Sequence, residues 1–356
     1  MAQLELKQVT KRFGANTALN DLTLSVKDGE FFVLLGPTGA GKTTALRTIV
    51  GLEKPTSGTV HIDGADVHEQ TAAERDVAMV FQYYSLYPRY TVRENLAFPL
   101  RSKVRRLPES EIAERIAWAA KTLRIEHLLE RKTDRLSGGE MQRVSIGRAI
   151  VREPRAFLMD EPLSNLDAKL REALRGELKR LQTRLKSTFL FVTHDQVEAM
   201  SMGDRIGVMQ GGSVIQVGSP SEIYERPNSL FVAGFVGTPS MSLLPAEVKN
   251  GKISALGKAL DVPLAKGAAS GAAKVGIRAE DVIVGAKQPH SGTIHEVENF
   301  GVEKIVTLRS GEQLLRAAVA ASMSTPVGSK VTFGFKPGKV HCFELAGGQR
   351  INAEGK

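Results

Sequence analysis

Eight residues at positions 36–43 have the types and the spacing of a phosphate-binding loop. Glycines in such a loop take backbone angles that are closed to other residues, so successive N–H groups turn toward one anion. We expect this of Gly36, Gly39 and Gly41. Lys42 adds a positive charge, and the Thr43 hydroxyl can ligate Mg²⁺. The residues predicted to hold the β- and γ-phosphates of a nucleotide are Gly36, Pro37, Thr38, Gly39, Ala40, Gly41, Lys42 and Thr43.

A second glycine-rich segment lies about a hundred residues later, where Leu136 is followed by Ser137, Gly138 and Gly139. Ser137 can cap a helix that runs from about residue 139 to 152. The two glycines let a phosphate approach the helix N-terminus. The alternative is a Ser-Gly helix cap that binds no ligand.

Polar side chains also end several runs that are mostly apolar: Gln82, the pair Asp160 and Glu161, and His194. Continuous apolar runs predict buried parallel strands, and open α/β sheets bind ligands at the carboxyl ends of such strands. Hydrolysis of Mg·ATP needs one carboxylate near the metal and another that orients and polarises the attacking water. We expect Asp160 and Glu161 to supply these two groups.

The elements that position these residues can be read from the same pattern. Residues 30–35 form the apolar strand that enters the phosphate-binding loop, and residues 44–50 read as the helix that leaves it. An Asp-Gly pair at 28–29 predicts a tight hairpin between that strand and strand 21–26. Asp167 precedes a helix with leucines on one face, and an ordinary N-cap role for it stays open.

The periodicity changes twice along the chain. Residues 91–135 lose the strand pattern, and residues 109–129 have apolar residues at helical spacing, which predicts a helical insert. Residues 234–245 are rich in Gly, Pro and Ser, as in a linker, and short strands alternate with turns beyond them. The expected domains are an α/β domain over 1–235, its helical subdomain at about 88–152, and an all-β, OB-like accessory domain over 236–356.

Composition restricts the class of protein. The chain has 356 residues, of which 42% are hydrophobic and 24% charged, so it is globular and long enough for about two domains. Its single cysteine, Cys342, excludes an internal disulfide and fits a reducing compartment. We expect no signal peptide, and no apolar run approaches the roughly 18 residues that cross a bilayer. The net charge of +9 is compatible with nucleic acid, an anionic membrane surface or a solvated basic surface.

Two aromatic segments have more than one interpretation. Phe13 lies in a Lys-Arg-Phe-Gly stretch, where it can stack on a nucleobase or pack locally. Tyr83, Tyr84 and Tyr87 lie in a polar loop, which favours a contact surface over a core position.

The order of these motifs closely resembles the ATP-binding cassette (ABC) ATPases of membrane transporters, over nearly the whole chain. The Leu-Ser-Gly-Gly element is highly specific to that family. Glu140 stands where the family most often has Gln. This difference concerns the detailed properties of the helix that follows the Leu-Ser-Gly-Gly element, and not the family resemblance. Segments 86–96, 163–171 and 276–281 are similar to the carbohydrate-importer branch of the maltose and glycerol-phosphate systems, with Ala279 in place of the usual Pro.

The resemblance implies a P-loop NTPase cassette that hydrolyses ATP with Mg²⁺. It implies a homodimer, or a heterodimer with a paralogue, at the cytoplasmic face of the membrane. Its partners would be two membrane permease subunits and a solute-binding protein, with no nucleic acid expected. The solute would be a sugar, a polyol or a sugar derivative, chosen by the membrane and binding subunits.

The resemblance also implies a role for each site residue. Glu161 is expected to be the general base, and His194 to contact the γ-phosphate. Phe13 is expected to stack on adenine, with Thr44 joining the phosphate-binding residues. The residues expected to order Mg²⁺ and water are Thr43, Asp160 and Gln82. The remaining expected nucleotide-binding residues are Ser137, Gly138 and Gly139, which complete the partner subunit's site, and Asp167.

The main alternative is a soluble ABC ATPase that acts on nucleic acid or ribosomes, which the basic charge favours. Those proteins generally carry two cassettes in one chain or a long coiled-coil insertion, whereas this chain has one cassette and a short insert. A regulatory nucleotide-binding module without turnover is disfavoured by the presence of Glu161 and His194.

Overall fold

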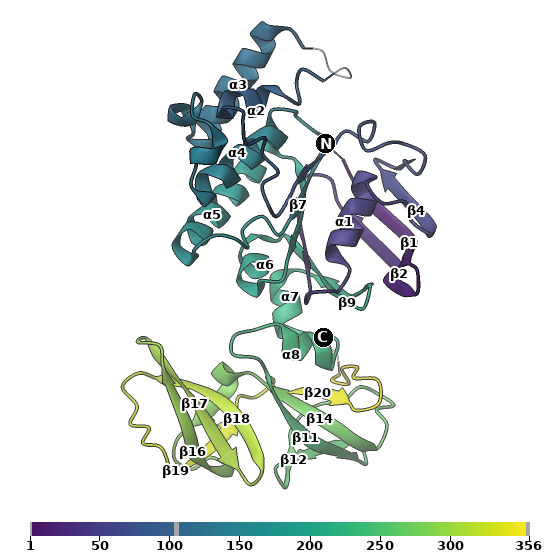
Figure 1. The fold of residues 1–356 in the computed structure, drawn as a ribbon. Coiled ribbons are helices and arrows are strands. Elements are labelled where there is room, and N and C mark those ends of the chain that lie inside the picture. Colours follow the sequence, from purple (N-terminus) through teal and green to yellow (C-terminus); the bar gives the residue numbers. More distant parts are fainter. Residues whose placement is uncertain (1, 103–106, 354–356) are drawn as a thin grey trace. The chain divides into compact units, whose positions relative to one another are not determined.

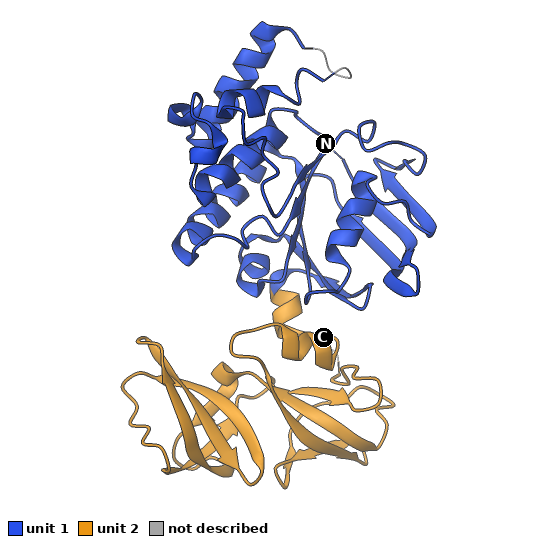
Figure 2. Ribbon diagram, viewed as in Figure 1, with its two compact units in different colours: residues 1–220 blue, residues 221–356 orange. Residues whose placement is uncertain are grey.

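The computed structural model describes residues 2–102 and 107–353, which separate into two compact units between residues 220 and 221 (Figure 2). The predicted domain boundary at 235/236 falls inside the second unit. Arg278 accounts for this, because its guanidinium donates to the carbonyl oxygens of Tyr224 and Val236 and ties the preceding segment to the β domain. Residues 103–106 of the predicted helical subdomain, and residues 1 and 354–356 of the predicted domains, lie outside the described residues.

The first unit contains two sheets (Figure 1). An antiparallel sheet has the strand order β2-β1-β4-β5, and a larger sheet has the order β10-β9-β3-β8-β7-β6. In the larger sheet β9, β3, β8, β7 and β6 are parallel, and β10 pairs with β9 in the antiparallel sense. The strands are β1 (Leu4–Phe13), β2 (Asn16–Val26), β3 (Phe31–Leu35), β4 (Ser57–Ile62), β5 (Ala65–Asp66), β6 (Val77–Val80), β7 (Ala156–Asp160), β8 (Thr188–Thr193), β9 (Arg205–Gln210) and β10 (Ser213–Gly218).

Helices cover both faces of the larger sheet (Figure 1). Helix α1 lies between the two sheets, whereas α5 and α6 lie on the opposite face, and α2, α3 and α4 form the predicted helical insert. The helices are α1 (Lys42–Val50), α2 (Val92–Ala97), α3 (Glu109–Leu123), α4 (Gly138–Ile150), α5 (Ala168–Leu185) and α6 (Gln196–Met202), with 3₁₀ turns η1 (Glu126–Leu128) and η2 (Thr133–Arg135).

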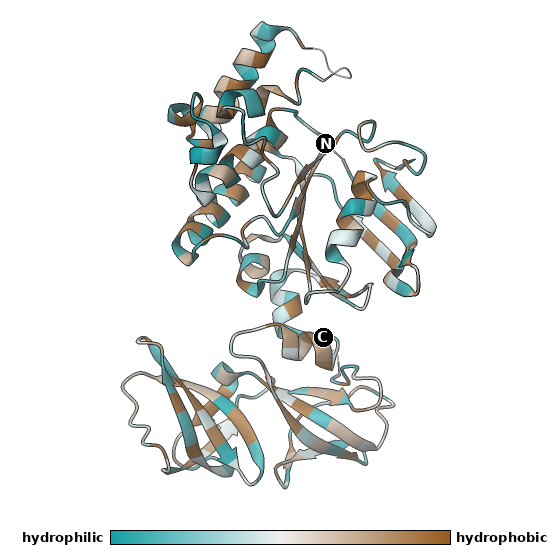
Figure 3. Ribbon diagram, in the orientation of Figure 1, coloured by the Kyte–Doolittle hydropathy of each residue, from teal (hydrophilic) through white to brown (hydrophobic). Residues whose placement is uncertain are grey.

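The core explains why the central strands are apolar throughout. Every residue of β3, β7 and β8 is buried, as both faces of a covered parallel sheet require. Figure 3 shows these central strands mostly in the brown of hydrophobic residues. On one face Leu46 and Ile49 of α1 pack with Leu34 of β3. On the other, the rings of Phe31 and Phe189 are 5.6 Å apart. Burying a side chain of this size contributes about 1.5–3 kcal/mol.

The predicted hairpin at residues 28–29 is wrong. Strand β2 pairs with β1, whereas β3 pairs in parallel with β8 and β9 in the other sheet. An apolar strand such as β3 needs cover on both faces, and the central position of the larger sheet provides it. Gly29, at φ 69°, still makes a turn between the sheets.

The second unit confirms the predicted all-β accessory domain. Its two five-stranded antiparallel sheets, β13-β12-β11-β14-β20 and β15-β19-β16-β17-β18, share one core in which Leu244 and Val275 meet Val306 and Phe333. Short helices α7 (Pro220–Glu225), which starts at the end of the first unit, and α8 (Leu230–Phe235) precede them. The other elements are β11 (Ser242–Lys249), β12 (Lys252–Ala255), β13 (Lys258–Leu260), β14 (Gly271–Ile277), η3 (Ala279–Asp281), β15 (Val282–Val284), β16 (His290–Asn299), β17 (Glu303–Ser310), β18 (Gln313–Ala320), β19 (Lys330–Phe335) and β20 (His341–Glu344).

Candidate functional site

Three neighbouring parallel strands bring the predicted polar residues to one edge of the central sheet. β3 leads into the loop at residues 36–43, β7 ends at Asp160, and β8 ends at Thr193. Two backbone hydrogen bonds tie these strand ends together. The amide of Gly36 donates to the carbonyl of Thr193 at 3.4 Å, and the amide of Glu161 donates to Val192 at 3.0 Å. The sheet therefore sets the spacing between the loop and the two carboxylates.

The three glycines of the loop are needed for different reasons. Gly39 and Gly41 have φ values of 81° and 99°, in the left-handed region as predicted. Gly36 does not, and that part of the prediction is wrong. A Cβ atom on Gly36 would lie 2.5 Å from the carbonyl oxygen of Met209, so the close approach of β9 requires glycine there.

Lys42 folds back over the loop. Its buried ammonium donates to the carbonyl oxygens of Gly36 at 2.9 Å and Pro37 at 3.0 Å, and lies 3.5 Å from Glu161 Oε1. Burial lowers the pKa of Lys42, an effect that Glu161 and Asp160 oppose. A positive charge is thus held at the point where the sequence predicts phosphate.

Glu161 is held between two basic groups. Its Oε2 atom lies 2.9 Å from Nδ1 of His194, and its Oε1 atom faces Lys42. Glu161 has a φ of 44°, in the left-handed region that costs a residue with a Cβ atom about 1–3 kcal/mol. Such strain clusters at functional sites, and here the neighbouring strand ends hold it in place.

Thr43 and Asp160 form a direct pair, in which the hydroxyl of Thr43 donates to Asp160 Oδ1 at 2.9 Å. Burial raises the pKa of Asp160, and the hydrogen bond from Thr43 opposes that rise. Hydroxyl and carboxylate oxygens are the hard ligands that Mg²⁺ prefers. Within residues 2–102 and 107–353, no cluster of three or more His, Cys, Asp or Glu side chains has the placement of a metal site. The pair therefore suits Mg²⁺ shared with nucleotide phosphates and water, and it does not form a complete protein cage.

Gln82 lies beside the segment that follows Glu161. The side-chain amide of Gln82 donates to Ser164 Oγ at 3.3 Å, and the backbone carbonyl oxygen of Gln82 accepts from Asn165 Nδ2 at 3.0 Å. Ser164 in turn donates to the carbonyl of Glu161 at 2.9 Å. Gln82 is therefore connected to Glu161 through Ser164. The sequence analysis gave Ser164 no role in the site, although it lies in segment 163–171, which carries part of the family resemblance.

Ser137 caps helix α4 through a capping box with Glu140. The Ser137 backbone amide and hydroxyl donate to Glu140 Oε2 at 2.8 Å and 2.9 Å. These hydrogen bonds hold the pKa of Glu140 below its usual range. Ser137 is exposed, Gly138 is half-buried, and Gly139 is buried against the side chain of Leu170. The structure shows the helix cap, and it leaves the Ser137 edge open at the surface.

Asp167 and Phe13 lie at the surface. Asp167 caps helix α5 by accepting from the amide of Leu170 at 3.0 Å, so the N-cap interpretation is confirmed. Phe13 ends strand β1 with 46% of its surface exposed, and the Lys11 ammonium lies 4.8 Å from its ring centre. An exposed ring at this position is free to stack on a flat ligand.

The sequence analysis missed a polar network formed by residues on either side of His194 in the sequence and by Arg171. The Thr193 hydroxyl donates to the buried Glu198 at 2.6 Å, and Arg171 contacts Asp195 at 3.4 Å. Asp195 caps helix α6 by accepting from the amide of Glu198. The Asp-x-x-Glu spacing at 195–198 is the pattern of a helix start and could have signalled this network.

An aromatic cluster is exposed directly after Gln82. Tyr83 is 76% exposed, and the rings of Tyr87 and Phe98 are 4.5 Å apart. The loop backbone is fixed to helix α4, because Ser145 Oγ donates to the carbonyl of Tyr84 at 3.0 Å. Exposed aromatic patches of this kind mark interaction surfaces.

Comparison with known families gives two matching profiles. The ABC transporter family profile matches residues 19–164, and a TOBE domain profile matches residues 275–343. Among the residues the structure describes, no helix is long and apolar enough to cross a membrane.

Two relatives are similar along the whole chain. A sulfoquinovosyl glycerol transport ATP-binding protein of Agrobacterium fabrum is 44% identical over 355 residues, which cover 97% of this chain and 98% of that protein. A trehalose/maltose import ATP-binding protein of Thermococcus litoralis is 44% identical over 373 residues, covering 99% of this chain and all of that protein. These names favour transport over the soluble, nucleic-acid-directed alternative.

A solved structure shares the fold of the first unit. The dimeric, post-hydrolysis ATP-binding cassette MJ0796, bound to ADP and Pi, has a TM-score of 0.55 and 34% identity, covering 61% of this chain and 98% of that one. The phosphate-binding loop, the two carboxylates and the histidine lie at one sheet edge. Together with these matches, they show that the chain belongs to the ABC transporter family, as an ATP-binding protein.

Proposed function

We propose that this chain hydrolyses ATP to drive the import of a carbohydrate-like solute through partner membrane subunits. The observation that carries the proposal is the arrangement of Lys42, Glu161 and His194 at one edge of the central sheet. The relatives that match the full length of this chain are transport or import ATP-binding proteins. The second unit would serve as an accessory domain, and the chain would work at the cytoplasmic face of the membrane.

Each site residue has a proposed role that its geometry supports. Lys42 and the loop amides neutralise the phosphates of ATP, and Phe13 stacks on adenine. Glu161 accepts the proton of the attacking water, since one of its oxygens is oriented by His194 at 2.9 Å. His194 reaches the γ-phosphate. Thr43 and Asp160 hold Mg²⁺, which supplies charge neutralisation when bound.

Gln82 fits a role between the site and a partner. It touches Ser164, which bonds to the backbone of Glu161, and it directly precedes the exposed aromatic loop. A change at Glu161 can therefore reach the loop surface through two hydrogen bonds. The aromatic loop is proposed to dock a membrane subunit, since tyrosine is favoured in the anchors of protein interfaces.

Two copies are proposed to form a head-to-tail pair, with Ser137 and Gly139 of one copy completing the nucleotide site of the other. Ser137 is exposed at a helix N-terminus, where backbone amides favour an anion. The cassette MJ0796 is dimeric with ADP and Pi bound, which supports the pairing of two copies. The dimer would be a homodimer or a heterodimer with a paralogue.

The two relatives share the same 44% identity but act in systems for different solutes. We infer that the ATPase chain does not select the solute. The test is to identify two permeases and a binding protein encoded beside this chain, then to reconstitute them in liposomes. ATP turnover is expected to rise with one sugar, polyol or sugar derivative of a panel. ATP hydrolysis that responds to nucleic acid, and to no solute or permease, would contradict the proposal.

A further inference from the structure

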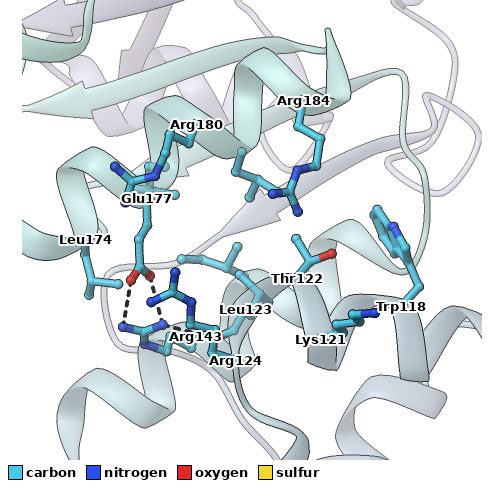
Figure 4. Close-up of a pocket in the computed structure, with 13 residues that line it drawn as sticks. Trp118, Lys121, Thr122, Leu123, Arg124, Arg143, Leu174, Glu177, Arg180 and Arg184 are labelled. Atoms are coloured by element: carbon cyan, nitrogen blue, oxygen red, sulfur yellow. Dashed lines mark hydrogen bonds and ion pairs between the residues drawn. The ribbon is translucent and has the colours of Figure 1, made fainter.

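A cavity lies away from the nucleotide site, between α3, α4 and α5 (Figure 4). Its volume is about 470 Å³, within the range of pockets that hold small organic ligands. The inner wall is apolar and is formed by these side chains: Leu123, Ile146, Leu174, Leu178 and Leu181. Trp118 stands at the edge, 37% exposed, with its indole ring available to a ligand.

The rim of the cavity is basic. Lys121 and Arg124 come from the end of α3, and Arg180 and Arg184 from the end of α5. Among the described residues, none of these four cations forms an ion pair. Figure 4 shows Arg184 extending from α5 toward the α3 side chains Trp118 and Thr122.

The single carboxylate of the lining, Glu177, is already satisfied. It pairs with Arg143 at 2.8 Å and 3.1 Å, and Arg143 also donates to the carbonyl of Leu123 at 3.0 Å. The pair is therefore neutral and leaves the four rim cations unbalanced.

We propose that this cavity binds a small, soluble organic anion with an aromatic or other apolar body. The apolar wall and Trp118 take the body, and the rim cations take one or more phosphate, sulfonate or carboxylate groups. The site spans the helical insert and helix α5, so an occupant stabilises their present arrangement. It is separate from the nucleotide site and does not depend on the proposed function.

Trp118 makes the site directly measurable, because it is the single tryptophan of the chain. The probe is anilinonaphthalene sulfonate, which has an aromatic body and one negative charge. It is titrated into the full chain saturated with ADP, with excitation of Trp118 and detection of the sensitised probe emission. A saturable signal is expected, and a signal that rises without saturation would overturn the site.

The double variant Arg180→Gln/Arg184→Gln is expected to bind the probe at least about fivefold more weakly, since two exposed charge contacts are lost. The matched control is Lys7→Gln/Lys27→Gln, which removes the same charge from exposed positions of the antiparallel sheet region. Affinity equal to that of the parent in the arginine variant, or an equal loss in the control, would refute the assignment.

Two competitors define the ligand class. Naphthalene sulfonate is expected to displace the probe at lower concentration than inorganic phosphate at matched ionic strength, because phosphate has no apolar body. Equal displacement would overturn the requirement for an apolar body. Anionic phospholipid vesicles are expected to leave the signal unchanged. Displacement by vesicles that depends on Arg180 and Arg184 would assign the cavity to a membrane surface and refute a soluble ligand.

Discussion

The Nδ1 atom of His194 lies 2.9 Å from Oε2 of Glu161, although the two residues come from different strand ends. The same carboxylate has its other oxygen 3.5 Å from the Lys42 ammonium. With one oxygen on each basic group, the carboxylate has a fixed orientation at the edge of the phosphate-binding loop. Its left-handed backbone angle, at φ 44°, shows that the fold accepts strain to keep it there.

The Glu161→Gln variant is expected to keep ATP binding and to lose turnover by about 10²–10⁴-fold, because glutamine keeps the size of the side chain but cannot accept the proton. The measurements are nucleotide affinity and steady-state phosphate release. As a control, Glu153→Gln removes an exposed carboxylate outside the site. ATPase activity near that of the parent in Glu161→Gln would refute the assignment of the base.

The head-to-tail pair can be tested by mixing two defective chains. Lys42→Ala removes the phosphate-binding ammonium, and Ser137→Arg blocks the helix N-terminus of α4. In a mixed dimer one composite site keeps both elements and the other loses both. ATP-driven association, measured by sedimentation, is expected in the mixture and absent from either variant alone. No rescue in the mixture would show that Ser137 does not act on the partner's nucleotide.

Glu140 is expected to weaken the same composite site. Its carboxylate holds the amide and hydroxyl of Ser137, and its pKa is depressed, so it carries a negative charge where a phosphate would approach. Glutamine preserves the capping box without that charge. Glu140→Gln should lower the ATP concentration for half-maximal dimerisation by about two- to fivefold. The control is Glu126→Gln on η1, and an unchanged or higher ATP requirement in Glu140→Gln would contradict this prediction.

The sequence was informative where a pattern is local. Apolar runs that end in Asp160 or His194 predict parallel strands and therefore a shared sheet edge, and the structure has that edge. The all-β second unit likewise follows from short alternating strands.

Other features depend on contacts between distant parts of the chain, which no local pattern reports. Gly36 is required by the approach of Met209, and strand β3 leaves its expected hairpin to join β8 and β9. The direction of the Gln82 side chain depends on Ser164, and the basic cavity requires two helices that are far apart in the sequence.

His341 gives the second unit a predicted pH dependence. Burial, with nearby Arg350, Arg278 and Lys339, lowers the pKa of His341 to about 4. An unfolded histidine has a pKa of about 6.5, so between pH 6.5 and 4 the unfolded chain takes up a proton that the folded chain does not. Stability is therefore full above about pH 6.5 and falls as the pH drops, by up to about 3 kcal/mol at pH 4.

Cys342 provides the measurement for that pH effect, because it is the single cysteine, is buried beside His341 and has its thiol pKa raised to about 12. Its rate of reaction with a thiol probe, divided at each pH by the rate for the unfolded chain, reports opening of the second unit. The division removes the fall in thiolate fraction as the pH drops. Opening is expected to increase from pH 7 to pH 5, and His341→Gln should flatten that increase. An equal increase in His341→Gln would place the pH sensitivity elsewhere.

Variants in the exposed aromatic loop can distinguish a transporter subunit from a soluble ATPase. Tyr83 is 76% exposed, whereas Tyr87 packs against Tyr90 and Phe98 and has the Arg148 guanidinium 5.2 Å from its ring centre. Tyr83→Ala therefore removes surface without removing ring contacts, and it is expected to leave thermal stability and nucleotide binding unchanged. Tyr87→Ala, in contrast, is expected to lose about 0.5–1.5 kcal/mol of stability, because it removes these ring contacts.

Both tyrosine variants should weaken capture of the permease pair or uncouple solute-stimulated ATP hydrolysis in liposomes, because each removes an aromatic anchor from the surface that Gln82 adjoins. Phe300→Ala, which removes another exposed aromatic side chain, is the matched control. Full assembly and full stimulation with Tyr83→Ala would count against this loop as the docking surface. Loss of permease capture in Tyr87→Ala alone, in proportion to its lost stability, would show that the cluster stabilises the insert and does not dock a partner.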